Sequence, residues 1–275
     1  MKSRLLVAAV GVPLVFVLLA VLPPWGTALL CAGISVIAAH ELLSCVGLGK
    51  SVFLTVVTGL SALWITLCLY MQWRLVWAGA GAAVYLLILA AFAVAYYEKG
   101  RGFGPGQTGA AIMAGAVVPL CFAALVYLRR GGAVGVYKVL VPFVIAFIGD
   151  GGAYFVGRAM GKHKLAPRTS PKKTVEGAIG GLVCSVGFAL IYGLILRFAF
   201  HTDVLFGRLA VMGAVGGVVS QLGDLFFSLF KRESGIKDYG TLLKEHGGIL
   251  DRFDSMAPLA PVVAAMFYFW PPFGA

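Results

Sequence analysis

Long apolar runs dominate this chain, and polar residues are concentrated in the stretches between them. A helix needs about 20 apolar residues to cross the hydrocarbon core of a bilayer, and most of these runs have that length. We therefore predict an all-α fold, that of a polytopic integral membrane protein with about nine transmembrane helices. The predicted spans are Leu5–Leu22, Thr27–Val46, Val52–Met71, Leu75–Tyr97, Thr108–Leu128, Val134–Val156, Val175–Phe200, Val204–Phe230 and Ser255–Trp270.

The composition excludes several other classes of protein. Hydrophobic residues make up 60% of the 275 residues and charged residues only 12%, and the mean hydropathy is +0.95. A soluble domain of this size has too little interior to bury so much apolar surface. The same composition excludes an intrinsically disordered chain, and it makes nucleic acid an unsuitable partner despite the formal net charge of +11.

The basic residues predict how the chain is oriented in the membrane. Cytoplasmic connectors carry an excess of Lys and Arg, and a cytoplasmic N-terminus places most of the 22 basic residues on that side. Lys2, Lys50 and Lys99 are expected to act only as topology signals. The first apolar run is longer than the core of a typical secretory signal peptide, so we expect it to be retained as a span. A bacterial cytoplasmic membrane is the predicted location.

Two long polar connectors interrupt the later part of the chain. They cover residues 157–174 and 231–254, whereas the connectors between the first five spans are short. We predict a group of N-terminal transmembrane helices over residues 1–130 and a group of C-terminal helices over residues 131–275. Both long connectors are expected on the cytoplasmic side, where they would form one shared catalytic site.

Acidic residues are rare, with only 11 Asp and Glu in the whole chain. Asp150 and Asp224 lie inside predicted spans, where an ionised group is costly and usually has a function. The alternative is that each carboxylate merely pairs with a Lys or Arg of a neighbouring helix. The charged connectors close to both residues favour a functional role.

The first long connector contains a candidate phosphate site. Ser170-Pro171 is typical of the start of a turn or helix, which places Lys172, Lys173 and Thr174 at the first helical positions. The N-terminus of a helix attracts anions through its free N–H groups and its dipole. Lysines at that terminus therefore predict phosphate binding.

The second long connector combines carboxylates with cations. On a helix, Asp224, Ser228 and Lys231 share one face at i, i+4 and i+7, and Asp251 and Asp254 share another at i, i+3. The adjacent glycines, Gly247-Gly248, allow the backbone to approach a ligand closely. Carboxylates near Lys and Arg are typical of a site for a magnesium–polyphosphate complex, because Mg²⁺ takes one or two carboxylates together with phosphate oxygens.

This second connector resembles the signature of the phosphatidate cytidylyltransferases, also called CDP-diacylglycerol synthases. The segment Asp150 to Gly181 resembles the same family, as does the His40-Glu41 pair to a lesser extent, and the close match covers roughly Phe147–Ser255. One departure is that Leu243-Lys244-Glu245 stands where the family usually has Leu-Pro-Gly. The matched signature positions are Ser228, Lys231, Arg232, Lys237, Asp238, Gly240, His246, Gly247, Gly248, Asp251, Arg252 and Asp254.

The resemblance implies a CTP:phosphatidate cytidylyltransferase that transfers CMP from CTP to phosphatidic acid, with Mg²⁺ and a monovalent cation such as K⁺ as cofactors. A lipid phosphate is already largely ionised near pH 7, so no protein nucleophile is required. Expected metal ligands are Asp224, Asp251, Asp254 and Asp150, with Glu176 and Asp238 orienting lysines. Expected catalytic residues are Asp224, Asp251, Lys172, Lys173, Lys231 and Arg252. Expected substrate-binding residues are Ser170, Thr174, Arg168, Arg232, Lys237, His246, Gly247 and Gly248.

Two other functions remain as alternatives. An ion-coupled transporter would use Asp150, Glu176 and Asp224 as coupling groups, and glycine-interrupted spans suit its broken helices. Such a transporter needs no connector of the kind found after Ser228. A phosphatidyl-group transferase acting on CDP-diacylglycerol is disfavoured because its aspartate motif is absent from this sequence. The same glycine spacings also suit helix packing or a homodimer.

Overall fold

The computed structural model describes residues 17–19, 21–242 and 247–274. The described chain forms two compact units, and each is presented by itself. The described residues of the first lie within Met1–Tyr127 and Ser234–Phe253, and those of the second lie within Leu128–Glu233 and Asp254–Ala275. Most of the first predicted span, Leu5–Leu22, lies outside the described residues.

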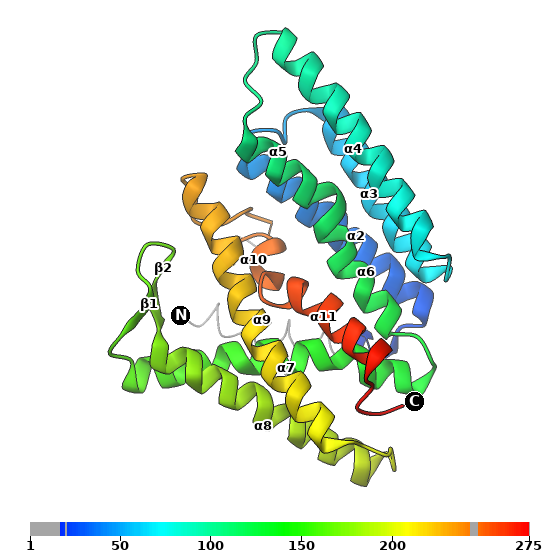
Figure 1. Ribbon diagram of the computed structural model, residues 1–275, viewed down its shortest axis with the longest axis vertical. Coiled ribbons are helices and arrows are strands. Elements are labelled where there is room, and N and C mark those ends of the chain that lie inside the picture. The colour runs from blue at the N-terminus through cyan, green and yellow to red at the C-terminus, as the bar shows by residue number, and fades with distance from the viewer. Residues whose placement is uncertain (1–16, 20, 243–246, 275) are drawn as a thin grey trace. The chain divides into compact units, whose positions relative to one another are not determined.

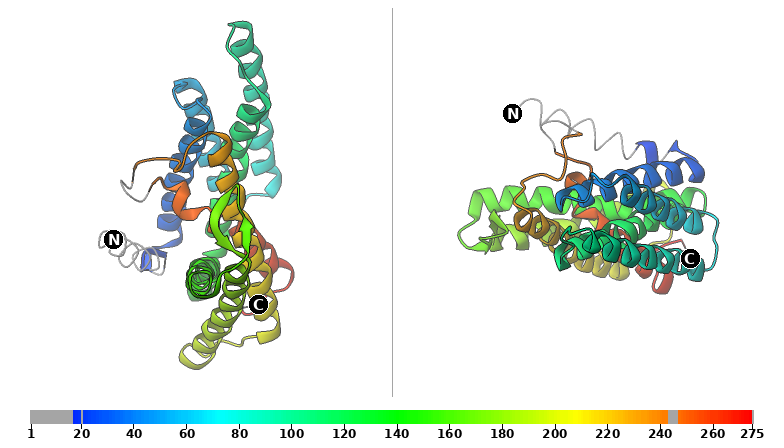
Figure 2. Two further views of the ribbon diagram at one scale, coloured as in Figure 1. Left: turned by 90° about the vertical axis from the view of Figure 1, so that its left-hand side faces the viewer. Right: turned by 90° about the horizontal axis from the view of Figure 1, so that it is seen from above.

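The first unit is a group of packed helices (Figure 1). Helix α2 packs against α3, and α3 against α4, and the two views in Figure 2 show α3 and α4 side by side. The elements are α2 (Pro24–Cys45), α3 (Val52–Tyr70), α4 (Leu75–Glu98), α5 (Pro105–Ile112), the π-helical turn η1 (Met113–Val117), α6 (Val118–Leu128) and the short α10 (Leu250–Phe253).

The turn η1 interrupts the span from Pro105 to Leu128 at a place where polar side chains bond to its backbone. A π-helical turn leaves carbonyl groups without their usual helical partners. The Ser61 hydroxyl donates to the carbonyl of Gly115 at 2.6 Å, and the Tyr85 hydroxyl donates to that of Ala111 at 2.7 Å. The first of these buried hydrogen bonds ties the turn to α3, and the second ties the end of α5, just before the turn, to α4.

The second unit combines long helices with a small hairpin. Its elements are α7 (Ala133–Met160), β1 (Lys164–Ala166), β2 (Ser170–Thr174), α8 (Val175–Ala199), α9 (Phe206–Glu233) and α11 (Met256–Phe269). Helices α7 and α8 pack closely because small residues line their contact. A side chain at Gly149 would collide with Ser185, whose hydroxyl donates to the carbonyl of Ile145 at 3.0 Å. The hairpin (yellow-green in Figure 1) connects α7 and α8.

The hairpin corrects one prediction. Lys172 and Lys173 do not occupy the first turn of a helix, because Ser170–Thr174 is an extended strand paired antiparallel with Lys164–Ala166. Helix α8 begins only at Val175, and Thr174 is its N-cap, whose hydroxyl accepts from the N–H of Gly177 at 3.2 Å. Pairing across the hairpin satisfies backbone groups that the local sequence pattern predicts at a helix terminus.

The described helices confirm an integral membrane protein with a predominantly helical fold. Seven of them are long and apolar enough to cross a membrane, and the apolar α11 is shorter, with 14 residues. Helix α4 shows why burial within the protein does not explain this hydrophobicity, since only Ala78, Tyr85 and Leu89 are buried along its 24 residues. Its other apolar side chains suit a lipid environment. The total of nine spans stays a prediction.

Candidate functional site

A cavity in the second unit gathers several of the predicted site residues. Its volume is about 380 Å³, which is within the usual range for small-molecule sites. It lies where the hairpin meets α7, α8 and α9. The lining residues are Asp150, Ala153, Tyr154, Gly157 and Arg158 of α7, Leu165 of β1, Lys172, Lys173 and Thr174 of β2, Gly177 and Ala178 of α8, and Gln221 and Asp224 of α9.

An ion pair joins the hairpin to α9 at this cavity. The ammonium nitrogen of Lys173 lies 2.6 Å from Oδ2 of Asp224, and both side chains are partly exposed. The Ser228 hydroxyl donates to Oδ1 of Asp224 at 3.2 Å, as the i, i+4 spacing on one helix face predicts. The Asp224 carboxylate is therefore held on both oxygens, with its negative charge opposite a lysine.

Asp150 supplies the second carboxylate of the cavity. The Ser255 hydroxyl donates to its Oδ2 at 2.8 Å. This contact brings the start of the α11 segment to α7 and orients the Asp150 carboxyl group. Ser255 was not predicted as a site residue, and a serine next to the motif carries little signal by itself.

Three further charged residues form contacts elsewhere in the second unit. The ammonium nitrogen of Lys231 lies 3.5 Å from Oδ2 of Asp254, and both side chains are largely buried. The guanidinium of Arg232 donates to the carbonyl of Thr169 at 3.3 Å. Arg232 therefore ties the end of α9 to the loop of the hairpin, next to Arg168 and Ser170.

The first unit contains a second cluster, built around the loop before α10. Asp251 is only 8% exposed, and its Oδ2 accepts from the N–H of Tyr239 at 2.7 Å and from that of Gly248 at 2.9 Å. Gly247 has φ of +77°, a conformation that favours glycine. Asp251 thus organises the two-glycine loop that the signature contains.

Glu41 of α2 holds the same loop from the other side. Its two carboxylate oxygens accept from the N–H groups of Ile249 at 2.9 Å and Leu250 at 2.8 Å, and the side chain is 6% exposed. A side chain at Gly248 would collide with this carboxylate. The sequence by itself predicts no role for Glu41 beyond its part in the family resemblance. Like Asp150, Glu41 is an acid inside an apolar span, where an ionised group usually has a function, and this is the signal in the sequence that points to it.

The structure places the predicted residues in two groups. Lys172, Lys173, Thr174, Asp150 and Asp224 line the second unit's cavity. Arg168, Ser170, Lys231, Arg232 and Asp254 belong to the same unit, but they are not among the residues that line it. Lys237, Gly247, Gly248, Asp251 and Arg252 belong to the first unit. His246 and the departure at Leu243-Lys244-Glu245 lie outside the described residues.

Glu176 contacts the segment before β1, and its expected role of orienting lysine side chains stays a prediction. Its carboxylate lies 2.6 Å from Nδ1 of His163 and accepts from the backbone N–H of Lys162 at 3.0 Å. These bonds fasten the first turn of α8 to the segment that enters β1. Glu176 therefore stabilises the hairpin by which Lys172 and Lys173 are positioned.

The carboxylates of the cavity suit a cation that is shared with a phosphate ligand. Within the described ranges, no three His, Cys, Asp or Glu side chains are grouped closely enough to bind a metal ion by themselves. Asp150 and Asp224, however, line one cavity together with Lys172 and Lys173. Mg²⁺ typically uses one or two carboxylates and completes its coordination with phosphate oxygens and water, so this set of donors fits Mg²⁺.

Comparison with known proteins shows which family the chain resembles. The Cytidylyltransferase family matches residues 2–270. A phosphatidate cytidylyltransferase of Staphylococcus saprophyticus is 43% identical over 137 residues, which are 50% of this chain and 51% of that protein. A phosphatidate cytidylyltransferase of Haemophilus influenzae is 41% identical over 138 residues, which are 49% of this chain and 47% of that protein. One of Staphylococcus aureus is 45% identical over 129 residues, which are 47% of this chain and 48% of that protein. The chain thus spans about half the length of the curated relatives it matches.

Proposed function

Because the chain belongs to the cytidylyltransferase family, we propose that it is a phosphatidate cytidylyltransferase. It takes CTP and phosphatidic acid as substrates and yields CDP-diacylglycerol and pyrophosphate. The relatives that carry this name support the choice of substrates. We place the reaction at the cytoplasmic face of a bacterial inner membrane, where CTP is available and the lipid substrate is within reach.

The cavity of the second unit is the observation that carries this proposal. It combines two carboxylates, Asp150 and Asp224, with Lys172, Lys173 and Arg158. The walls come from helices that are apolar enough to span a membrane and from a hairpin of polar sequence. Such a cavity can receive a polyphosphate from water and a lipid head group from the bilayer.

The proposed reaction is a direct displacement. An ionised phosphate oxygen of phosphatidic acid forms a bond to the α-phosphorus of CTP. The bond between this phosphorus and the oxygen that bridges to the β-phosphate breaks, and pyrophosphate leaves with the bonding electron pair. Lys172 and Lys173 bind the phosphate oxygens and lower the repulsion between the two anionic substrates. The nucleophile needs no general base, because it is already ionised near pH 7.

Asp150 and Asp224 are the residues that we propose to hold Mg²⁺. When bound, Mg²⁺ would neutralise charge on the triphosphate. The contact between Lys173 and Asp224 positions a cation next to this carboxylate before substrates bind, and Ser228 and Ser255 fix the orientation of the two carboxyl groups. A monovalent cation stays an expectation from the family resemblance.

A product assay with the purified protein tests the proposed function. The protein in detergent micelles is supplied with labelled CTP, phosphatidic acid and Mg²⁺, and lipid-soluble label and pyrophosphate are measured together. We expect equal amounts of CDP-diacylglycerol and pyrophosphate, and neither product when phosphatidic acid is left out. Absence of both products from folded protein would contradict the proposal and would favour the ion-coupled transporter.

A further inference from the structure

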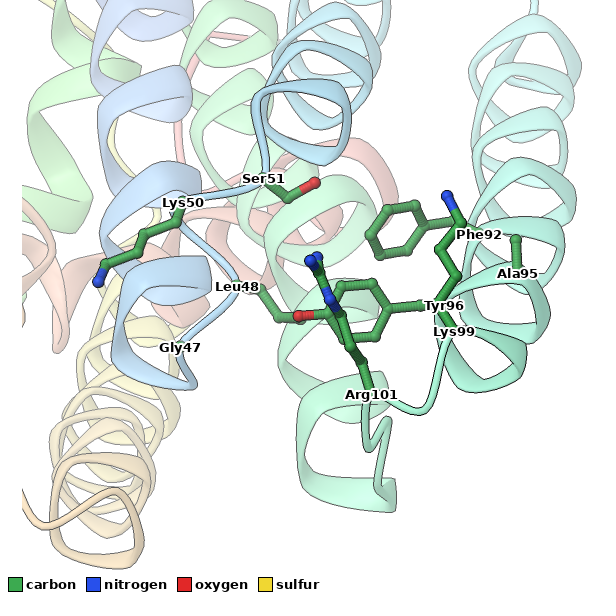
Figure 3. Close-up of a pocket in the computed structure, with 9 residues that line it drawn as sticks. All are labelled: Gly47, Leu48, Lys50, Ser51, Phe92, Ala95, Tyr96, Lys99 and Arg101. Atoms are coloured by element: carbon green, nitrogen blue, oxygen red, sulfur yellow. The ribbon is translucent and has the colours of Figure 1, made fainter.

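A second cavity lies in the first unit, apart from every residue given a catalytic role above. Its volume is about 240 Å³. It lies where the C-terminal ends of α2 and α4 meet the N-terminal end of α3. The lining residues are Gly47, Leu48, Lys50, Ser51, Phe92, Ala95, Tyr96, Lys99 and Arg101 (Figure 3).

The charge of this cavity is entirely positive. Three of the nine lining residues, Lys50, Lys99 and Arg101, are basic, and none of the nine is acidic. The guanidinium of Arg101 lies 5.4 Å from the centre of the Tyr96 ring. Figure 3 shows Arg101 beside Tyr96, whereas the Lys50 side chain points away from both. Lys99 and Arg101 are therefore the better placed cations for an anionic ligand.

Aromatic rings form the apolar wall next to these cations. The Phe92 ring is stacked on that of Phe53 with centroids 5.9 Å apart, and Phe103 contacts both Phe92 and Tyr96 at 6.1 Å. Tyr is enriched where a membrane protein meets the head groups of the lipids, and Tyr96 is the tyrosine of this cluster. A tyrosine beside cations suits the boundary between the apolar part of the bilayer and water.

The helices that form the cavity also present apolar side chains to their surroundings. Val56 on α3 is 52% exposed and Val94 on α4 is 64% exposed, and both helices are long and apolar enough to cross a membrane. A ligand at this cavity would thus have cations at one end and an apolar helix surface at the other. That combination matches an amphipathic molecule better than a small soluble anion.

We propose that this cavity binds the phosphate group of an anionic phospholipid, with Lys99 and Arg101 as its cationic contacts and the acyl chains against α3 and α4. Basic pockets between transmembrane helices commonly bind anionic head groups. The N-terminus of α3 adds a favourable dipole at Ser51, which is the N-cap of that helix. Lys99 would then be more than a topology signal. This lipid site does not depend on the proposed enzymatic function.

Lipid retention measured by native mass spectrometry tests the proposal. The protein in detergent micelles is titrated with phosphatidylglycerol, which is anionic, or with phosphatidylcholine, which has no net charge. We expect preferential binding of phosphatidylglycerol by the parent protein. Lys99→Gln and Arg101→Gln should each weaken that binding roughly fivefold, from the usual contribution of one cation near anionic lipid.

Matched variants make the experiment decisive. Arg74→Gln removes the same charge just before the opposite end of α4 (Leu75–Glu98) and should leave phosphatidylglycerol binding unchanged. The exchange Lys99→Arg with Arg101→Lys keeps both charges and should preserve binding, which separates loss of charge from loss of fold. The proposal is overturned if Arg74→Gln weakens binding as much as Arg101→Gln does. It is also overturned if inorganic phosphate displaces the lipid at equal concentration, because the cavity would then be a site for free anions.

Discussion

Lys173 and Asp224 come from a β-strand and a helix that are 51 positions apart in the sequence, and their charged groups lie 2.6 Å apart at the cavity of the second unit. Both side chains remain about one quarter exposed. An ion pair with this exposure adds little to stability. The ion pair instead positions a cation and a carboxylate together at the place where phosphate oxygens and Mg²⁺ are proposed to bind.

The first prediction concerns the charge of Lys173. Lys173→Gln should lower kcat/KM for CTP at least tenfold, because a charge-assisted hydrogen bond to phosphate contributes about 1.5–3 kcal/mol. Initial rates of CMP incorporation into lipid measure the effect. Lys164→Gln is the matched control, since Lys164 lies in the same hairpin, is exposed and does not line the cavity. Equal effects of the two variants would show that only the overall positive charge matters.

The second prediction concerns Mg²⁺. Asp224→Asn keeps the size of the side chain and removes the charge, so turnover should collapse at limiting Mg²⁺ while the melting temperature in detergent stays close to that of the parent. Asp203→Asn serves as the control because Asp203 is exposed in the connector before α9. Near-parental turnover of Asp224→Asn at limiting Mg²⁺ would exclude this residue as a ligand. A covalent CMP–protein adduct formed with CTP alone would exclude direct displacement.

The third prediction concerns the buried carboxylate of Glu41. Glu41→Ala leaves the N–H groups of Ile249 and Leu250 without the acceptors they have now. Each buried group without a partner costs about 1–3 kcal/mol, so cleavage by a protease within residues 234–253 should become faster. Glu98→Ala removes an exposed acid at the end of α4 in the same unit and should have no such effect. Unchanged cleavage of Glu41→Ala would mean that the loop does not depend on this carboxylate.

The fourth prediction concerns topology. Cysteines introduced at Lys164 and Lys237, both exposed, should react with a membrane-impermeant thiol reagent only from the cytoplasmic side. A cysteine at Arg74, also exposed, is expected on the opposite side and should react in intact cells. Labelling is measured against the parent protein with its five cysteines. Reaction of the first two positions from outside would refute the proposed orientation of the site.

Part of the candidate site was predictable from local sequence. The i, i+4 spacing of Asp224 and Ser228 predicts that they share one face of a helix, and the hydrogen bond between their side chains confirms this. The membrane class and most helix positions follow from runs of apolar residues, because the bilayer requires a fixed length of apolar helix whatever the neighbours are. The signature that begins at Ser228 could be recognised from sequence alone because its residues are close together along the chain.

Contacts between distant segments were decided only by the tertiary structure. The lysines after Ser170-Pro171 belong to a strand instead of a helix because the segment Ser170–Thr174 pairs with β1, and a local pattern does not reveal such a partner. The role of Glu41 arises from residues 208 and 209 positions away. The cation-lined cavity likewise exists only because the ends of three helices meet. Helical periodicity specifies which side chains share a face, whereas packing specifies which faces meet.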